Sequence, residues 1–211
     1  MNAREPSGPE RPILYYTPTT RAVRPRWLLE EMGVDYELRR IDLRSGEGQR
    51  PDYLSIHPLG KVPALSMGKT TIFESLAICM YLADRYPDRG MAPAMDASDR
   101  AAYCQWMAFS AGTLEPAAVD ALYRKKAAAR GGTVPVIRGF LASLNGALDT
   151  IETALADGGF LLGDRFTAAD IMNASLLMFA ERQGLLDGRD RLVAWLDVLR
   201  DRPAYQRSTA D

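Results

Sequence analysis

The sequence is poor in the residues that build metal and thiol sites. It contains one histidine, His57, and two cysteines, Cys79 and Cys104. A single histidine excludes most histidine-based zinc sites and makes a Ser-His-Asp triad hard to assemble. The cysteines are too few for a disulfide framework and lack the CxxC spacing of a redox or metal pair. We therefore expect a cytoplasmic protein, in a reducing environment, with no metal.

An excess of charge of one sign and long apolar runs are also missing. The chain carries 26 basic and 27 acidic side chains, for a formal net charge of −1. This balance argues against a nucleic-acid partner, because nucleic-acid-binding domains usually carry a basic excess on one face. No apolar stretch reaches the ~18 residues that a membrane helix needs, so no membrane partner is expected. Residues 1–11 lack the apolar segment of a secretory signal, and we expect a disordered lead-in there.

The pattern of apolar residues changes near residue 90, from mixed strand and helix patterns to helical patterns alone. Before that point, short runs rich in apolar and β-branched residues predict four strands: 13–16, 36–41, 64–67 and 70–73. Apolar residues at helical spacing predict two helices: 23–32 and 75–85. Gly33 is placed to end the first helix, and Gly68 with Lys69 fits a tight hairpin turn. The strand–helix–strand order predicts a parallel pair of strands with a right-handed crossover.

Beyond residue 96 no strand pattern survives. Helical periodicity there predicts four long helices: 99–114, 136–155, 167–182 and 191–200. The segment 87–93, which contains two prolines and a glycine, is a candidate linker. The sequence therefore predicts an α+β protein, with a small α/β domain over residues 12–87 and an all-helical domain over residues 95–211.

The first motif of interest is the segment from Gly60 to Leu65, in which Pro63 directly precedes a predicted strand. Proline cannot donate to a strand ladder and restricts Val62 to extended conformations. One interpretation is a trans proline that begins the strand. The other is a cis bond that turns the main chain of Val62 outward, so that its N–H and C=O groups meet an extended, peptide-like ligand.

The second motif is Glu74-Ser75, at the start of the predicted helix 75–85. The free N–H groups at a helix start attract a carboxylate, and Ser75 is a good residue for that position. A carboxylate on Ser75 and an amine on Glu74 would together hold an amino-acid head group. Simple capping of the helix is the structural alternative.

The third motif is the segment from Phe166 to Ile171, FTAADI. Thr167 is expected to cap the following helix while Asp170 bonds back to it. Phe166 and Ile171 have the spacing of a hydrophobic staple. We interpret this motif as a folding element of the helical domain.

Taken together, these segments resemble the cytosolic glutathione transferase family, from about Ile13 to Tyr205. The stretch HPLGKVPAL is similar to the family's Asn-Pro-x-Gly-x-Val-Pro segment, with His57 where asparagine is commoner. Glu74-Ser75 resembles its Glu/Gln-Ser pair, and FTAADI resembles the capping box of the sixth helix of its helical domain. The resemblance implies a thioredoxin-like first domain, an all-α second domain and a homodimer, in a bacterial-type member of the family.

The resemblance also implies glutathione as co-substrate. Its cysteinyl main chain would pair with Val62, next to Pro63, and its γ-glutamyl head would lie on Glu74 and Ser75. Its glycine carboxylate would lie near a basic or amide group. Three residues are candidates for that last contact: Lys61, Gln49 and Arg50.

The family's chemistry is activation of a thiol, whose pKa lies near 8.5 when free. In many classes of the family, a hydroxyl group at the end of the first strand bonds to the sulfur and activates the thiol. The corresponding turn here, 16–22, contains no cysteine or serine, which argues against disulfide chemistry. Thr20 best matches the serine just before the first helix in related bacterial sequences, with Thr17 and Tyr16 as alternatives. Arg21 either adds a favourable field for a thiolate or lies on the surface or in an interface.

The electrophile is expected between the two domains. Tyr103, Trp106 and Met107 recur at helical spacing in the first long helix of the second domain, where they either contact substrate or belong to the core. The activity implied is addition of the glutathione thiolate to a small, mostly apolar electrophile. A non-catalytic binder of glutathione or hydrophobic ligands, and a glutathione-dependent isomerase or peroxidase, stay open as alternatives.

Overall fold

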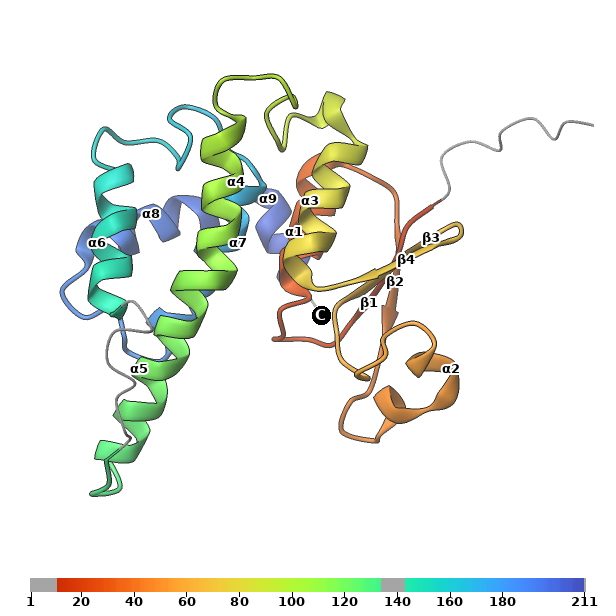
Figure 1. Cartoon of the computed structure of the whole chain (residues 1–211), viewed down its shortest axis with the longest axis horizontal. Helices are drawn as coiled ribbons and strands as arrows, with labels where there is room; N and C mark the ends of the chain where they lie inside the picture. The colour runs from red at the N-terminus through yellow and green to blue at the C-terminus, as the bar shows by residue number, and fades with distance from the viewer. Residues whose placement is uncertain (1–10, 134–142, 211) are drawn as a thin grey trace, which may run out of the picture.

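The computed structural model describes residues 11–133 and 143–210 and shows a sheet-containing unit followed by a helical unit (Figure 1). The expected lead-in lies almost wholly outside these ranges, as does the start of the helix predicted over 136–155. Arg11 is described, and its guanidinium contacts the Asp35 carboxylate at 3.1 Å. None of the helices in the two ranges is long and apolar enough to cross a membrane.

The first unit has the four strands and two helices that the sequence predicts, in the predicted order, and one further short helix, α2. Its elements are β1 (Ile13–Tyr16), α1 (Val23–Met32), β2 (Glu37–Arg40), α2 (Pro51–Leu54), β3 (Ala64–Met67), β4 (Thr70–Phe73) and α3 (Ser75–Arg85). Gly33 ends α1 with φ +60°, a conformation that costs glycine little. Gly68 has the same φ in the turn between β3 and β4, so both expected glycine turns are confirmed.

The four strands form one mixed sheet in the order β2-β1-β3-β4. β1 runs parallel to β2 and antiparallel to β3, and β3 runs antiparallel to β4. The predicted parallel pair, joined through α1, is therefore confirmed. Leu14 of β1 is opposite Leu38 on one side and Leu65 on the other, and Leu14 and Leu65 are fully buried.

The second unit contains six helices within the described ranges. They are α4 (Arg100–Phe109), α5 (Glu115–Ala128), α6 (Leu144–Ala154), α7 (Ala168–Arg182), α8 (Asp190–Arg200) and α9 (Pro203–Thr209). A π-helical turn, Ser110–Leu114, joins α4 to α5. The prediction of a helix that stops at Leu114 is therefore wrong. Pro116 lies in the first turn of α5, where a proline removes no intrahelical hydrogen bond, so the helix continues.

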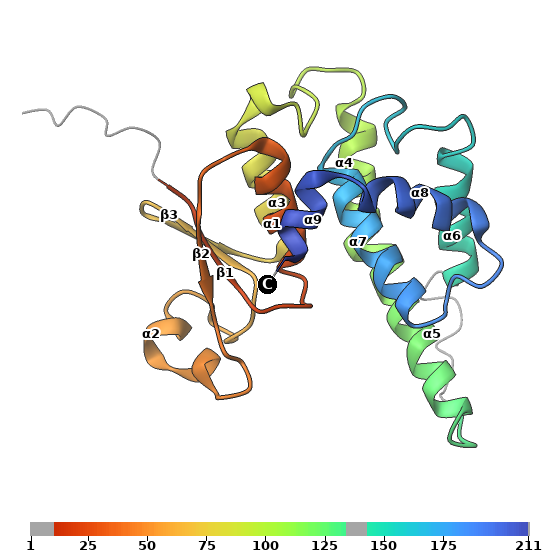
Figure 2. The same cartoon turned by 180° about the vertical axis from the view of Figure 1, so that it is seen from behind.

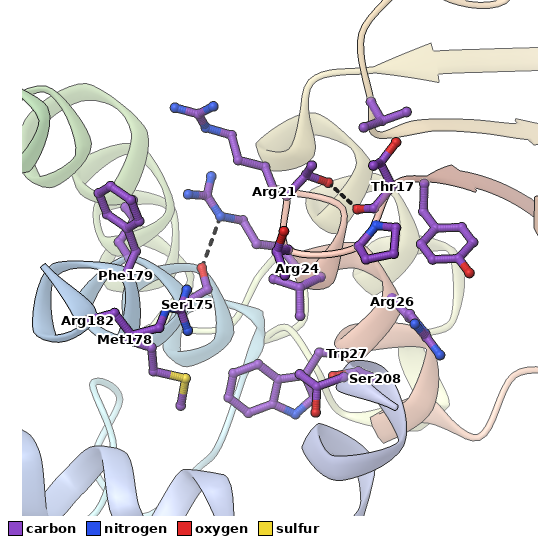
Figure 3. A pocket seen from close by; sticks show the side chains of 18 of the residues that line it. Thr17, Arg21, Arg24, Arg26, Trp27, Ser175, Met178, Phe179, Arg182 and Ser208 are labelled. Carbon is purple, nitrogen blue, oxygen red and sulfur yellow. Dashed lines mark hydrogen bonds between the residues drawn. The ribbon is translucent and has the colours of Figure 1, made fainter. Parts of the chain in front are cut away.

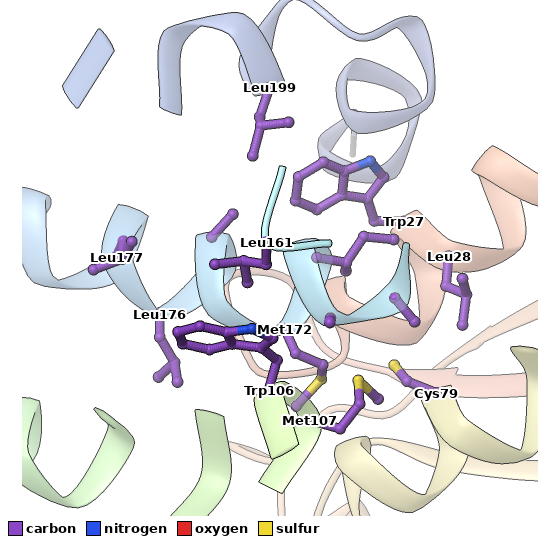
Figure 4. Close-up of a cluster of buried hydrophobic side chains, with 14 of the residues drawn as sticks. Trp27, Leu28, Cys79, Trp106, Met107, Leu161, Met172, Leu176, Leu177 and Leu199 are labelled. Atoms are coloured by element: carbon purple, nitrogen blue, oxygen red, sulfur yellow. The ribbon is translucent and has the colours of Figure 1, made fainter. Parts of the chain in front are cut away.

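The hydrophobic core runs through both units without interruption. α7 is its centre, because the side chains on most sides of this helix are buried. Figure 4 shows Trp27 and Leu28 of α1 and Cys79 of α3 in the same cluster as Trp106, Met172 and Leu177 of the helical unit. Part of the face between the two units is thus apolar core, which holds them together.

The last helix, α9, returns to the first unit and packs beside α1, as both views of the molecule show (Figure 2). The Tyr205 ring meets the edge of Trp27 at 4.8 Å between centroids. Arg202 is paired with Glu31 at 2.6 Å. This helix was not predicted from the sequence, and it brings residues from the end of the chain to the wall of the cavity described next.

Candidate functional site

A cavity of about 960 Å³ lies between the two units (Figure 3). One wall is the turn from β1 to α1, together with α1 itself and the Lys61-Val62 segment before β3. The other wall comes from α5, α7 and α9. This volume is at the upper end of the range typical of small-molecule sites.

The turn between β1 and α1 holds its hydroxyl groups in fixed positions. The Thr17 hydroxyl donates to the carbonyl oxygen of Ile41 at 2.7 Å. The Thr20 hydroxyl donates to the carbonyl oxygen of Thr17 at 2.6 Å and accepts from the main-chain N–H of Ala22 at 3.3 Å. Thr20 is therefore engaged twice in closing the turn, and Thr17 once. Tyr16, Thr17 and Thr20 all line the cavity.

Two non-glycine residues of the described ranges have a positive φ, and both belong to this region. Thr19 has φ +60° and Glu74 has φ +74°. Side chains with a Cβ rarely adopt this conformation, and such residues cluster at functional sites. The strain lies in the turn after β1 and at the start of α3, the two places where the sequence predicts ligand contacts.

The segment before β3 presents a free main chain to the cavity. The Val62-Pro63 peptide bond is cis, not trans; the contact of the Val62 main chain with a peptide-like ligand stays a prediction. Within residues 11–133 and 143–210, neither the N–H nor the C=O of Val62 has a hydrogen-bond partner. The Tyr53 hydroxyl holds the neighbouring Lys61 carbonyl at 2.6 Å, so the segment is anchored from behind.

A glycine pair supports the same segment. Gly60 has φ +59°, and a Cβ there would lie 2.3 Å from the carbonyl oxygen of Gly48. Only glycine fits such a close approach of two main chains. Gln49, a candidate for the glycine carboxylate, is exposed next to Gly60 and does not line the cavity. Lys61 does line it, and its side chain is free of partners within the described residues.

Glu74 and Ser75 stand beside the cavity and are not part of its lining. Ser75 is 7% exposed, and its hydroxyl accepts from the guanidinium of Arg24 at 3.0 Å. Because Arg24 itself lines the cavity, Ser75 lies directly behind its wall. Pro63, buried at the start of β3, also lies outside the lining.

Arg24 lines the cavity and was not predicted from the sequence as a site residue. Its guanidinium contacts three elements, each at 3.0 Å: Ser75 of α3, Ser175 of α7 and Glu115 of α5. Burial lowers the pKa of Arg24, and the Glu115 carboxylate opposes that shift. A signal was present, because Arg24 precedes Trp27 by three residues and Leu28 by four, which puts it on the buried stripe of α1.

The residues expected to contact the electrophile lie elsewhere. Tyr103 and Met107 are fully buried and Trp106 is 7% exposed, and none of the three lines the cavity. Trp106 and Met107 lie in the buried cluster with Met172 and Leu176 of α7 (Figure 4), and the Asn173 side chain of α7 donates to the Trp106 carbonyl oxygen at 3.1 Å. The inner face of α4 is therefore core, and the cavity wall comes from α5 and from a stripe of α7.

The α7 stripe consists of Ser175, Met178, Phe179 and Arg182, which are spaced three, one and three residues apart and line the cavity together. Figure 3 shows the four side chains on α7, with Met178 toward Trp27 of α1. The sequence did carry a signal for this wall: this face of α7 alternates polar and apolar residues, whereas the rest of the helix is mostly apolar. The apolar side chains here give an organic ligand a surface to pack against.

The electrostatics of the cavity favour an anion. Five basic residues line it, Arg21, Arg24, Arg26, Lys61 and Arg182, against one carboxylate, that of Glu115. Glu115 is shared by Arg21 and Arg24. A site with excess positive charge and apolar walls stabilises negative charge within it.

The two thiols of the chain take no part in this cavity. Cys79 is fully buried, and burial raises its pKa to about 12, which keeps it protonated. Cys104 is exposed and does not line the cavity. Among the residues described, no three or more His, Cys, Asp or Glu side chains are grouped so as to hold a metal ion.

Comparison with known proteins gives consistent matches over nearly the whole chain. The model of the glutathione S-transferase N-terminal domain matches residues 11–84, and that of the C-terminal domain matches residues 116–198. Glutathione S-transferase 3 of Zea mays is 31% identical over 205 residues, which covers 93% of this chain and 92% of the relative.

Solved structures agree with these matches. A glutathione transferase from Methylococcus capsulatus superposes with a TM-score of 0.78 at 29% identity and covers 94% of this chain and 97% of its own. A family member from Pseudomonas fluorescens, with two glutathione molecules bound, has a TM-score of 0.77 at 26% identity, covering 97% of this chain and 95% of its own. The thioredoxin-like first domain and all-helical second domain are thereby confirmed.

Proposed function

This chain belongs to the glutathione S-transferase family, and on that premise we propose that its cavity binds glutathione and joins the thiolate to a small, mostly apolar electrophile. The observation that carries the proposal is the free main chain of Val62, which opens into the same cavity that Thr17 lines. An extended tripeptide adds to such an edge as a strand would.

We place glutathione by the chemistry of the three groups around Val62. Its cysteinyl N–H and C=O pair with the main chain of Val62. Glu74 and Ser75 stand beside the cavity, so glutathione extends past the cavity lining at this end. Its γ-glutamyl amine lies at Glu74 and its carboxylate at Ser75, whose hydroxyl oxygen accepts from Arg24 and so leaves its hydrogen for the ligand. The glycine carboxylate lies at Lys61, the cation beside Val62, with Gln49 and Arg50 as the alternatives.

The register of the sheet favours Thr17 as the hydroxyl that activates the thiol. Tyr15 of β1 is opposite Ala64 of β3, and continuing this register by two residues places Thr17 opposite Val62. A cysteine paired with Val62 therefore brings its sulfur toward Thr17. Thr20 lies beyond this point and is engaged in closing the turn, so we propose a positioning role for it. Tyr16 lines the cavity next to them, with Arg26 over its ring at 5.4 Å.

The reaction then needs no covalent enzyme intermediate. The thiol proton leaves to solvent. The Thr17 hydroxyl turns its one hydrogen from the Ile41 carbonyl oxygen to the sulfur and, with the cationic lining, stabilises the thiolate. The sulfur electron pair forms the bond to the electrophilic carbon, and a leaving group such as chloride departs with the electron pair of the broken bond. Holding both reactants in one cavity supplies proximity.

Three variants at the turn test this assignment in an aryl-halide conjugation assay. A hydrogen bond to a charged sulfur contributes about 1.5–3 kcal/mol, so Thr17→Val is expected to lower kcat about 10- to 100-fold. Thr17→Ser keeps the hydroxyl and should retain most of the rate. Thr20→Val, the matched control, should lose about 1 kcal/mol of stability through its two hydrogen bonds in the turn and much less activity. Equal rates for Thr17→Val and the parent protein would overturn the assignment.

We further propose a cytoplasmic homodimer with domain boundaries at residues 12–87 and 95–211. Two exposed apolar side chains support the dimer, because they would be buried in an interface: Leu59 is 60% exposed and Phe73 is 36% exposed. His57 contacts both residues. Its ring centroid lies 4.9 Å from that of Phe73, and its Nδ1 accepts from the Leu59 N–H at 3.2 Å. Analytical ultracentrifugation tests the dimer, and a single species of monomer mass at micromolar concentration would contradict it.

A further inference from the structure

We propose that the electrophile this cavity takes carries a carboxylate, and that Arg182 binds it. This inference rests on the proposed function and narrows it, because it names the chemical class of the second substrate. It concerns the α7 wall of the cavity, which is separate from the residues assigned to glutathione.

Arg182 is exposed, and it differs from other exposed arginines by its position on α7. A solvated arginine usually lies opposite the apolar stripe of its helix. Arg182 lies in line with Met178 and Phe179 on the face that lines the cavity. Figure 3 shows its side chain among those of the same α7 stripe, next to Met178. A ligand that packs on Met178 and Phe179 therefore lies close to the Arg182 guanidinium.

The other arginines of the cavity are already occupied. Arg21 and Arg24 share the Glu115 carboxylate. Arg26 donates to the carbonyl oxygens of Arg207, at 3.2 Å, and Ala210, at 2.8 Å. Each of these side chains is held by protein groups and is less available to a second ligand.

Arg182, by contrast, has no hydrogen bond, ion pair or ring contact of its side chain within residues 11–133 and 143–210. Its nearest carboxylate along the chain, Glu181, is paired with Arg200 of α8. Lys61 is the other cation of the cavity without a partner, and it lies beside Val62, where the glycine end of glutathione is placed. Arg182 is therefore the cation left for the electrophile.

The chemistry of the wall fits an aromatic or aliphatic acid. Met178, Phe179 and Val119 supply apolar surface, and the guanidinium offers two parallel N–H groups that match a carboxylate. The pair is partly exposed to solvent, so we expect an effect near the lower end for such contacts, about tenfold in affinity.

Two acceptors that differ at one position test the inference: 4-chloro-3,5-dinitrobenzoate and 4-chloro-3,5-dinitrobenzotrifluoride. In both, the thiolate attacks the carbon that bears chlorine and chloride leaves. Arg182→Gln is expected to raise KM for the benzoate about tenfold and to leave KM for the trifluoride unchanged. Arg182→Lys, which keeps the charge without the planar fork, should recover part of the loss. Arg89→Gln, an exposed arginine on the Pro87–Arg89 turn outside the cavity, is the matched control.

An equilibrium measurement separates this inference from the proposed function. Calorimetry with unreactive 3,5-dinitrobenzoate on the glutathione-loaded protein should show about tenfold weaker binding in Arg182→Gln. That loss without turnover of either acceptor would support the anion site and refute the conjugating activity. Turnover of the trifluoride with unchanged benzoate binding and KM in Arg182→Gln would support the activity and overturn the anion site. Equal losses for both acceptors would also overturn it.

Discussion

Arg24 of α1 is buried and bonds to three other helices. Replacing Arg24 and its carboxylate partner Glu115, singly and together, tests how much these contacts stabilise the packing of the two domains. The guanidinium is 5% exposed and the Glu115 carboxylate is 15% exposed. Arg24 also reaches Ser75 and Ser175, so one cation ties the start of α3 to α7 and α5. We consider the variants Arg24→Met and Glu115→Gln, and the double variant.

The loss of unfolding free energy in each variant depends on which buried charge is left without its partner. Breaking a buried ion pair by removing one partner costs about 3–5 kcal/mol. In Arg24→Met the Glu115 carboxylate keeps Arg21, so we expect about 3 kcal/mol. In Glu115→Gln the buried Arg24 guanidinium keeps only serine hydroxyls and an amide, so we expect about 4 kcal/mol. In the double variant no buried charge is stranded, and its cost should fall below the sum by about 2 kcal/mol.

Urea unfolding at one fixed protein concentration measures these differences, with thermal unfolding as a second readout. For a chain of this size, 1 kcal/mol shifts Tm by about 2–4 °C, so Arg24→Met should lower Tm by about 6–12 °C. Single-variant costs that add within 0.5 kcal/mol would show that Arg24 and Glu115 do not interact in the folded protein, and would refute the reasoning.

Two further predictions concern Asp170 and Glu74. Asp170→Ala should cost about 3 kcal/mol, because the Asp170 carboxylate accepts from the buried N–H groups of Leu161 and Thr167 at 2.8 Å each and both would lose their partner. Burial raises the pKa of Asp170 from 3.8 to about 6, so the folded state binds more protons than the unfolded state between those values. The unfolding free energy should then fall as pH rises from about 4 to 6, by up to about 3 kcal/mol, and a fall of the same size in Asp170→Asn would contradict this. Glu74→Ala should weaken glutathione binding far more than it lowers Tm, as calorimetry and thermal unfolding together can show. An unchanged dissociation constant would remove Glu74 from the site.

The local patterns of the sequence predicted the first domain well. Strand runs, helical periodicity and turn glycines are local signals, and the structure has each element in the expected order. The capping box was equally readable: Thr167 and Asp170 exchange the expected contacts, with the Asp170 carboxylate 2.8 Å from the Thr167 N–H. These features depend on residues a few positions apart, which the sequence displays directly.

The cavity walls were less predictable because they depend on tertiary contacts. The Tyr103, Trp106 and Met107 stripe has the composition of either a core or a ligand wall, and packing against α7 decides for the core. The three partners of Arg24 lie 51, 91 and 151 positions away in the chain. The helix α5 was hidden by Pro116, whose place in a first turn is visible only once the preceding π-helical turn is known.

The central claim is that this cavity binds glutathione and makes its thiol reactive. The most direct test is the ultraviolet absorbance of the thiolate, followed against pH with the protein saturated by glutathione. The account predicts that the pKa of the bound thiol lies about one to two units below the free value near 8.5, because Thr17 and the cationic lining favour the anion. A bound thiol that titrates as it does in free solution would contradict the account.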